Sequence, residues 1–248
     1  MKPAFALLAT AAIFASAACN AENGGNASGN TSPIEAVAPP AGGDWTKMVS
    51  RTPEGGFLMG NPGADVKLVE FASMTCPHCA EFEEKGAAKL VNDFVKTGRV
   101  SFEFRNYVRD PYDLAASLIA RCGGPERFFP LSNALFENQR EWTGKLQTVA
   151  PEQLEALQNL GPDQQFLQIA KLSGLQQWAA QRGLPSAKSN ACLTNTQEIN
   201  QLVQMNSDTT SQYPDFAGTP SFVINGKMLD KTATWEKLEP QLREAIGS

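Results

Sequence analysis

Residues 66–79 read VKLVEFASMTCPHC, an apolar run that ends in two cysteines separated by two residues. The run has the composition of a buried strand, and a helical pattern begins at Ala80. This order of strand, cysteine pair and helix places Cys76 at a helix N-terminus. The unpaired N–H groups and the positive end of the helix dipole stabilise negative charge there, so we expect Cys76 to ionise more readily than a free cysteine. We expect Cys79, one turn further along, to be less exposed.

A second motif lies far downstream, where residues 218–226 read GTPSFVING. Together with Glu70-Phe71, Cys76-Pro77-His78-Cys79 and the following Phe82, it resembles the DsbA-like thiol:disulfide oxidoreductases. The resemblance extends from about Phe57 to the C-terminus. It implies an α/β protein with a thioredoxin fold and an inserted helical subdomain.

The resemblance also implies the roles of the motif residues. Cys76 and Cys79 would be the catalytic dithiol, with Pro77 and His78 between them, and the His78 imidazole would help to stabilise the Cys76 thiolate. His78 is the only histidine in the chain, so neither a Cys/His zinc set nor a Ser-His-Asp triad can be assembled. We therefore predict no metal site and no separate cofactor.

Two downstream residues are candidates for substrate binding. By resemblance, Pro220 is a cis proline beside the dithiol, and the backbone of Thr219 pairs with an extended substrate. The alternative is a trans proline at the start of a strand.

Glu70 interrupts an otherwise apolar strand. By resemblance, an acidic residue six positions before the first cysteine is buried below the active site, where burial would raise its pKa and suit it to proton exchange with Cys79. A purely structural role is the alternative. Arg105 is a possible partner for Glu70, although a solvated arginine is the simpler interpretation.

The composition is that of an ordinary globular protein. The 248 residues are 42% hydrophobic and 19% charged, with a net charge of −5. No basic run is present that could neutralise phosphates, so we predict no binding to nucleic acid.

The N-terminus has the features of an export signal. Residues 1–18 combine a short charged start, an apolar segment and small residues before Cys19, which predicts a signal peptide. The site resembles a bacterial lipobox, with Cys19 as the lipidated residue, but Ser16 stands where a leucine-like residue is usual. Cleavage without lipidation, giving a soluble periplasmic protein, is the alternative. Residues 19–43 are rich in Gly, Asn, Ala, Ser and Pro and predict a disordered tether.

The remaining chain divides into three parts. Residues 44–110 predict a βαβ half, residues 111–205 a helical insertion that begins at Asp110-Pro111, and residues 206–248 a ββα half. Asn225-Gly226 predicts a two-residue hairpin turn in the second half.

Two cysteines, Cys122 and Cys192, lie within the insertion. Because exported proteins rarely keep unpaired cysteines, we predict a structural disulfide between them, with two free buried thiols as the alternative. Their position resembles the second disulfide of some alphaproteobacterial DsbA-like proteins.

These features predict a periplasmic enzyme that donates its Cys76–Cys79 disulfide to unfolded secreted proteins with free thiols. By resemblance, a DsbB-like quinone-linked membrane protein would reoxidise it. Thr219 keeps a disulfide isomerase or reductase as the close alternative, because threonine before the cis proline also occurs in such relatives. A third alternative is a non-catalytic lipoprotein that holds copper or zinc with the dithiol.

Overall fold

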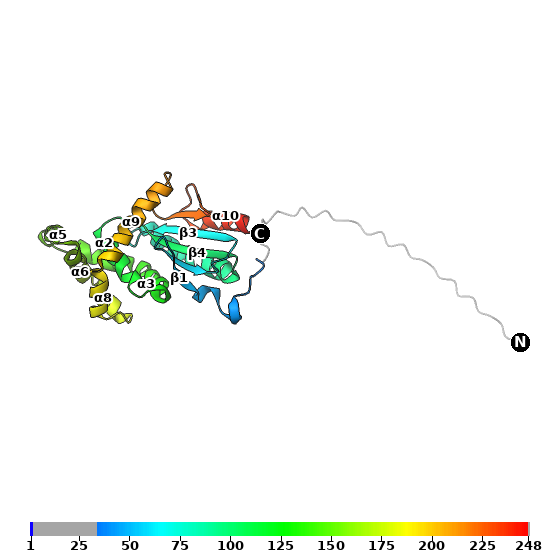
Figure 1. The fold of residues 1–248 in the computed structure, drawn as a ribbon, viewed down its shortest axis with the longest axis horizontal. Helices are drawn as coiled ribbons and strands as arrows, with labels where there is room; N and C mark the ends of the chain where they lie inside the picture. The colour runs from blue at the N-terminus through cyan, green and yellow to red at the C-terminus, as the bar shows by residue number, and fades with distance from the viewer. Residues whose placement is uncertain (2–33, 248) are drawn as a thin grey trace. The chain divides into compact units, whose positions relative to one another are not determined.

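A six-stranded sheet lies at the centre of the computed structural model, which describes Met1 and residues 34–247 (Figure 1). The predicted signal peptide, Cys19 and most of the predicted tether lie outside the described residues. The strand order is β1-β2-β4-β3-β5-β6. The strands are β1 (Val49–Arg51), β2 (Phe57–Gly60), β3 (Val66–Ala72), β4 (Val100–Asn106), β5 (Ser221–Ile224) and β6 (Lys227–Met228).

The apolar run of the first motif forms β3, which is paired on both sides. It runs parallel to β4 and antiparallel to β5, so that Glu70 lies opposite Phe104 on one side and Phe222 on the other. Strands β3 and β4 are connected by a helical segment, as the predicted βαβ unit requires.

The connecting helix begins at the cysteine motif. Helix α1 (Pro77–Phe82) continues through wider π-type turns, η3 (Glu83–Ala87) and η4 (Leu90–Phe94), and closes with a 3-10 turn, η5 (Val95–Thr97). Gly98 then adopts φ 74°, a left-handed conformation typical of a residue that ends a helix. Such π-type turns are frequent at functional sites.

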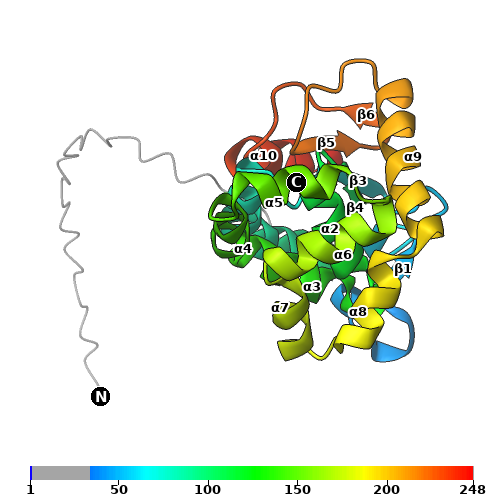
Figure 2. The ribbon, with the colours of Figure 1, turned by 90° about the vertical axis from the view of Figure 1, so that its left-hand side faces the viewer.

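The helical insertion lies toward one end of the sheet (Figure 1), and its helices face the viewer in Figure 2. Its helices are α2 (Pro111–Arg121), α3 (Pro125–Glu137), α4 (Gln139–Gln147), α5 (Pro151–Gln158), α6 (Pro162–Leu172), α7 (Leu175–Gln181), α8 (Ser186–Leu193) and α9 (Thr196–Gln212). Asp110 caps α2 by accepting a hydrogen bond from the Asp113 amide, as the Asp-Pro pair predicts. Helix α9 continues to Gln212, beyond the boundary predicted at residue 205.

Sheet and insertion share the main hydrophobic core. Phe128 of α3 stacks on Phe57 of β2 with 4.0 Å between ring centroids, and lies edge-on to Phe104 of β4 at 5.2 Å. The insertion is therefore packed into the same core that supports the cysteine motif.

The chain closes with the predicted hairpin and helix. Asn225 and Gly226 have φ values of 50° and 83°, as a two-residue turn of type I′ requires. Helix α10 (Trp235–Ile246) packs on the connecting helix, where Trp235 lies edge-on to Phe94. The predicted thioredoxin fold with a helical insertion is confirmed.

The segment before β1 is docked on the fold. The Val37 amide donates to the Thr97 carbonyl at 2.7 Å, and the Trp45 indole donates to the Val37 carbonyl at 2.8 Å. This segment, with the turns η1 (Pro40–Gly42) and η2 (Trp45–Lys47), leaves no room for a side chain at Gly98. Part of the predicted tether, from Ile34 onward, is thus packed against the fold.

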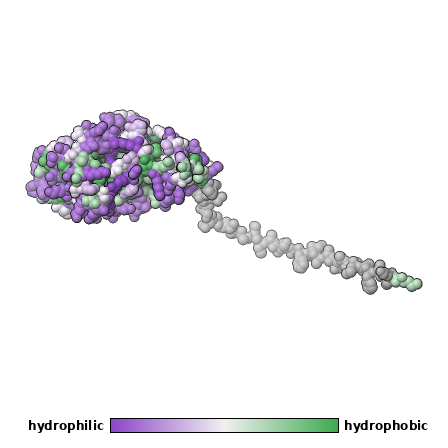
Figure 3. All heavy atoms as spheres, turned by 60° about the horizontal axis from the view of Figure 1, so that its bottom comes forward, coloured by the Kyte–Doolittle hydropathy of each residue, from purple (hydrophilic) through white to green (hydrophobic). Residues whose placement is uncertain are grey.

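The surface shown in Figure 3 is largely hydrophilic, with small apolar areas. Among the described residues, no helix has both the length and the apolar character that a bilayer crossing requires.

Candidate active site

Cys76 stands at the start of α1, where the sequence places it. Strand β3 ends at Ala72, a short loop follows, and Cys76 occupies the N-cap position with extended backbone angles. Its amide donates to the Ser73 carbonyl at 3.1 Å, and its own carbonyl accepts the Ala80 amide at 3.2 Å. The Cys76 sulfur therefore belongs to the helix end whose backbone amides have no hydrogen-bond partner within the helix.

Both thiols of the motif are buried. Cys76 is 2% exposed and Cys79 1% exposed, and the two are not bonded to each other. Cys79 is the less exposed of the two, as expected, but the difference is small because the Thr219 segment lies against Cys76: the Cys76 Sγ donates to the Thr219 carbonyl at 3.1 Å. Pro77 and His78 are the exposed part of the motif.

The two thiols differ in acidity. A hydrogen bond from the Cys79 thiol lowers the pKa of Cys76 to about 5, with help from Thr219 and the backbone amides of Cys79 and His78, whereas burial acts in the opposite direction. Burial raises the pKa of Cys79 well above its ordinary value, and its hydrogen bond to Cys76 and the nearby Glu70 raise it further. Of the two thiols, Cys76 is thus the one that ionises at neutral pH.

His78 contributes through its backbone. Its side chain is 73% exposed and its Nδ1 lies 3.7 Å from Glu81 on the same helix face, so stabilisation of the Cys76 thiolate by the imidazole stays a prediction. The backbone amide of His78 is the group that lowers the pKa of Cys76.

Glu70 is buried near the dithiol. Side chains alternate along β3, so Glu70 shares a sheet face with Leu68 and Ala72, which belong to the same core cluster as Cys79 and Phe82. Glu70 is 3% exposed, and burial raises its pKa well above the ordinary value, with further increases from Glu83 and Cys76.

A second acidic residue, Glu83, follows Cys79 by one turn. Burial raises the pKa of this half-buried carboxyl to about 7, and Glu137 of α3 adds to the increase. No signal in the sequence distinguished Glu83 from the exposed Glu84 beside it.

Arg105 binds other carboxylates rather than Glu70. Its guanidinium donates to both oxygens of Glu103, at 2.8 and 2.9 Å, and lies 3.8 Å from Glu54. Its side chain is 14% exposed, so the prediction of a solvated arginine is also wrong. The side chains of Arg105 and Glu70 lie on opposite faces of the sheet, because successive residues of a strand alternate between the two faces.

Thr219 and Pro220 lie immediately before β5. The peptide bond between them is cis, Pro220 is buried, and Thr219 is half-buried. The next residue, Ser221, pairs with Phe71 of β3, which places the Thr219 carbonyl beside the cysteine motif.

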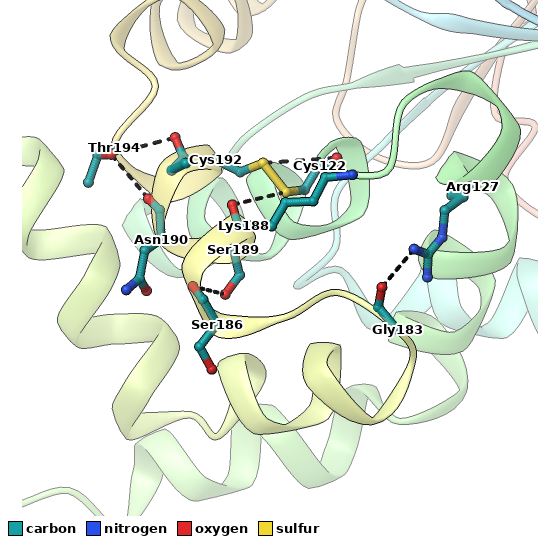
Figure 4. The surroundings of a disulfide bond; sticks show 10 residues. Cys122, Arg127, Gly183, Ser186, Lys188, Ser189, Asn190, Cys192 and Thr194 are labelled. Carbon is teal, nitrogen blue, oxygen red and sulfur yellow. Dashed lines mark hydrogen bonds between the residues drawn. A yellow bond between two sulfur atoms is a disulfide. The ribbon is translucent and has the colours of Figure 1, made fainter.

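Cys122 and Cys192 are joined in a disulfide that connects the end of α2 to α8 (Figure 4). Their Cα atoms are 5.6 Å apart, and the bond closes a separation of 70 residues. Both cysteines are partly buried.

A groove of about 1380 Å³ borders the motif. Pro77 and His78 line it together with Val91 of η4 and Phe129 and Phe136 of α3. The groove thus runs between the cysteine helix and the insertion.

Two residues of the insertion reach the loop before Cys76 and were not identified from the sequence. The Asp113 carboxyl of α2 accepts the Met74 amide at 2.8 Å, and the Gln139 side chain of α4 donates to the Met74 and Cys76 carbonyls at 2.8 and 2.9 Å. Asp113 follows the Asp110 cap, which marks a helix start but not this contact. Nothing in the sequence around Gln139 indicates its role.

Comparisons with known proteins agree with this geometry. A family model described as thioredoxin matches residues 52–244. A protein-disulfide isomerase from Novosphingobium aromaticivorans is 35% identical, with a TM-score of 0.73 over 77% of this chain and 97% of that one. Wolbachia pipientis alpha-DsbA1 shares the fold, with 20% identity and a TM-score of 0.61 over 77% of this chain and 90% of that one.

A Rickettsia prowazekii protein, named as a proposed protein-disulfide oxidoreductase, is 26% identical over 182 residues. The match covers 73% of this chain and 58% of the relative, so the chain spans less than two thirds of that relative's length. With the family model, the shared fold and the two motifs in place, the chain belongs to the thioredoxin family, in the DsbA-like form that carries a helical insertion.

Proposed function

We propose that this protein is a periplasmic thiol:disulfide oxidoreductase that donates a Cys76–Cys79 disulfide to secreted proteins. The observation that carries the proposal is the difference in acidity between the two thiols. Neutral pH is about two units above the pKa of Cys76, and each unit corresponds to about 1.4 kcal/mol, so ionisation favours the reduced form by roughly 3 kcal/mol. A stabilised reduced form makes the disulfide form an oxidant.

The reaction begins with the oxidised pair. A substrate thiolate attacks the Cys76 sulfur, the bond between Cys76 and Cys79 breaks, and a mixed disulfide forms on Cys76. Cys79 takes up a proton as it leaves, and the proposed donor is Glu70, the nearby buried carboxyl whose pKa is raised by burial.

A second substrate thiolate then attacks the substrate sulfur of the mixed disulfide. The substrate leaves oxidised, and Cys76 leaves as a thiolate, the favourable leaving group because its pKa is low. The backbone of Thr219, beside the Cys76 sulfur, is placed to pair with an extended substrate during these steps.

Each cycle leaves two electrons on the dithiol. We propose that a DsbB-like quinone-linked membrane protein accepts them, and that unfolded secreted proteins with free thiols are the substrates. A lipid on Cys19 would hold the enzyme at a membrane, and the signal at residues 1–18 supports export to the periplasm.

The proposal is tested by trapping the intermediate. Cys79→Ser, mixed with a reduced unfolded protein and an oxidised small-molecule disulfide, should accumulate a mixed disulfide that mass spectrometry locates on Cys76. The same substitution combined with Cys76→Ser is the control. A trapped substrate on another cysteine, or none at all, would contradict the mechanism.

Disulfide isomerisation is the second candidate. It is favoured by the name of the Novosphingobium relative, a protein-disulfide isomerase, and by threonine at position 219. Incubation of the reduced protein with a substrate that carries incorrect disulfides distinguishes the two: an isomerase restores the correct pairing without net oxidation, whereas the proposed oxidase remains slow in that assay.

A further inference from the structure

The first residue of α4 contacts the cysteine motif although it lies in the helical insertion. Gln139 is 6% exposed, and its Nε2 donates to the Met74 carbonyl at 2.8 Å and to the Cys76 carbonyl at 2.9 Å. A primary amide nitrogen carries two hydrogens, so both donors of Gln139 are used on this loop.

The same loop is held from its other side. Asp113 of α2 is fully buried, and its carboxyl accepts the Met74 amide at 2.8 Å and the Arg109 amide at 2.9 Å. Met74 therefore has its N–H bound by one insertion helix and its carbonyl by another. The Cys76 position is anchored on the insertion as well as on β3.

Through the Cys76 carbonyl, the contacts from the insertion reach the residue that carries the reactive thiol. This carbonyl accepts both the Gln139 amide and the first helical hydrogen bond of α1, from Ala80. The direction of that peptide group determines where the Cys76 sulfur lies relative to the amides of His78 and Cys79. A loosened carbonyl would let the sulfur move away from the donors that stabilise its charge.

We propose that Gln139 is a positioning residue of the dithiol: by holding the Cys76 carbonyl, it keeps the Cys76 sulfur aligned with the start of α1, so that the helical insertion sets the redox equilibrium of the pair. This inference rests on the proposed function. It assigns to the insertion a direct influence on the dithiol, in addition to covering it.

The test is the equilibrium between the full-length protein and glutathione at pH 7. Gln139→Met keeps the length of the side chain and removes both donors. The equilibrium constant should shift roughly fivefold toward the disulfide form, because the reduced form loses a hydrogen-bonded arrangement that stabilises the thiolate. Gln147→Met, at the exposed end of the same helix, is the matched control and should remain at the wild-type value.

The outcomes separate this inference from the proposed function. An unreactive wild-type dithiol would overturn the proposed function, and the inference with it. Reversible exchange in the wild type with an unchanged constant in Gln139→Met would overturn the inference alone. Should that variant fail to fold, as judged by circular dichroism, Gln139→Asn decides the question, because its amide is set back by one methylene from both carbonyls and should shift the constant in the same direction without adding a charge.

Discussion

The two cysteine pairs of this protein differ in their exposure, in their separation along the chain and in whether they are bonded. Cys122 and Cys192 are partly exposed, lie 70 residues apart in the chain and are bonded. Cys76 and Cys79 are buried, lie at a helix start and are free in the structure. The buried pair keeps both thiols, and the acidity of each is strongly perturbed, in opposite directions.

The comparison teaches that the groups around a thiol, rather than its exposure, decide its chemistry. Burial alone raises the pKa of a thiol, as it does for Cys79. Cys76 is also buried, yet its pKa falls to about 5 because side-chain hydrogen bonds with Cys79 and Thr219 and the backbone amides of Cys79 and His78 favour its thiolate. The bonded pair instead connects two helices of the insertion.

The largest effect is expected from the reactive pair. Cys76→Ser should reduce disulfide transfer to a reduced test protein to the uncatalysed rate, because serine cannot form the mixed disulfide. The rate is measured by loss of free thiols in the substrate. Substantial disulfide transfer by this variant would contradict the assignment of Cys76 and Cys79 as the reactive pair.

The bonded pair should affect stability instead. Replacement of both Cys122 and Cys192 by serine should lower the free energy of unfolding by roughly 4 kcal/mol, because the bond closes a long loop. Urea denaturation measures this change, and the rate of disulfide transfer is followed in parallel. A loss of transfer with unchanged stability would reverse the two assignments.

A smaller, pH-dependent effect is expected from the carboxyl groups near the reactive pair. Glu83 has a pKa raised from an ordinary 4.5 to about 7, so it favours the folded state below pH 4.5 and loses that contribution as the pH rises through 7. Glu83→Gln should therefore gain stability relative to the wild type between these values, by at most about 3 kcal/mol.

Denaturation of both proteins at pH 4, 6 and 8 checks this sign. Glu84→Gln, which removes a charge from the neighbouring exposed position, is the matched control. A Glu83→Gln difference that does not vary with pH would show that this carboxyl is not held in its neutral form.

The fold was predictable because its signals are local. The apolar run before Cys76, the Asp110 cap and the Asn225-Gly226 turn each specify an element within a few residues, and each element is present. The π-type turns after Phe82 were not predictable, because periodicity of the apolar residues does not distinguish them from a regular helix.

The candidate site was predictable only in part. Cys76, Cys79 and Thr219 could be found from motifs, whereas the burial of Cys76 depends on a contact 143 residues away in the chain. The contacts of Asp113 and Gln139 with the loop before Cys76 depend on how the insertion packs on the sheet. No local pattern encodes that packing.

The central claim is that Cys76 ionises far more readily than Cys79. Titration of the reduced protein, followed by thiolate absorbance in the ultraviolet, tests it directly, with Cys76→Ser as the control. We predict one thiolate with a midpoint near pH 5, absent in the control, and ionisation of Cys79 only at a pH well above its ordinary range. A midpoint for Cys76 near that of a free cysteine, about 8.5, would contradict the account.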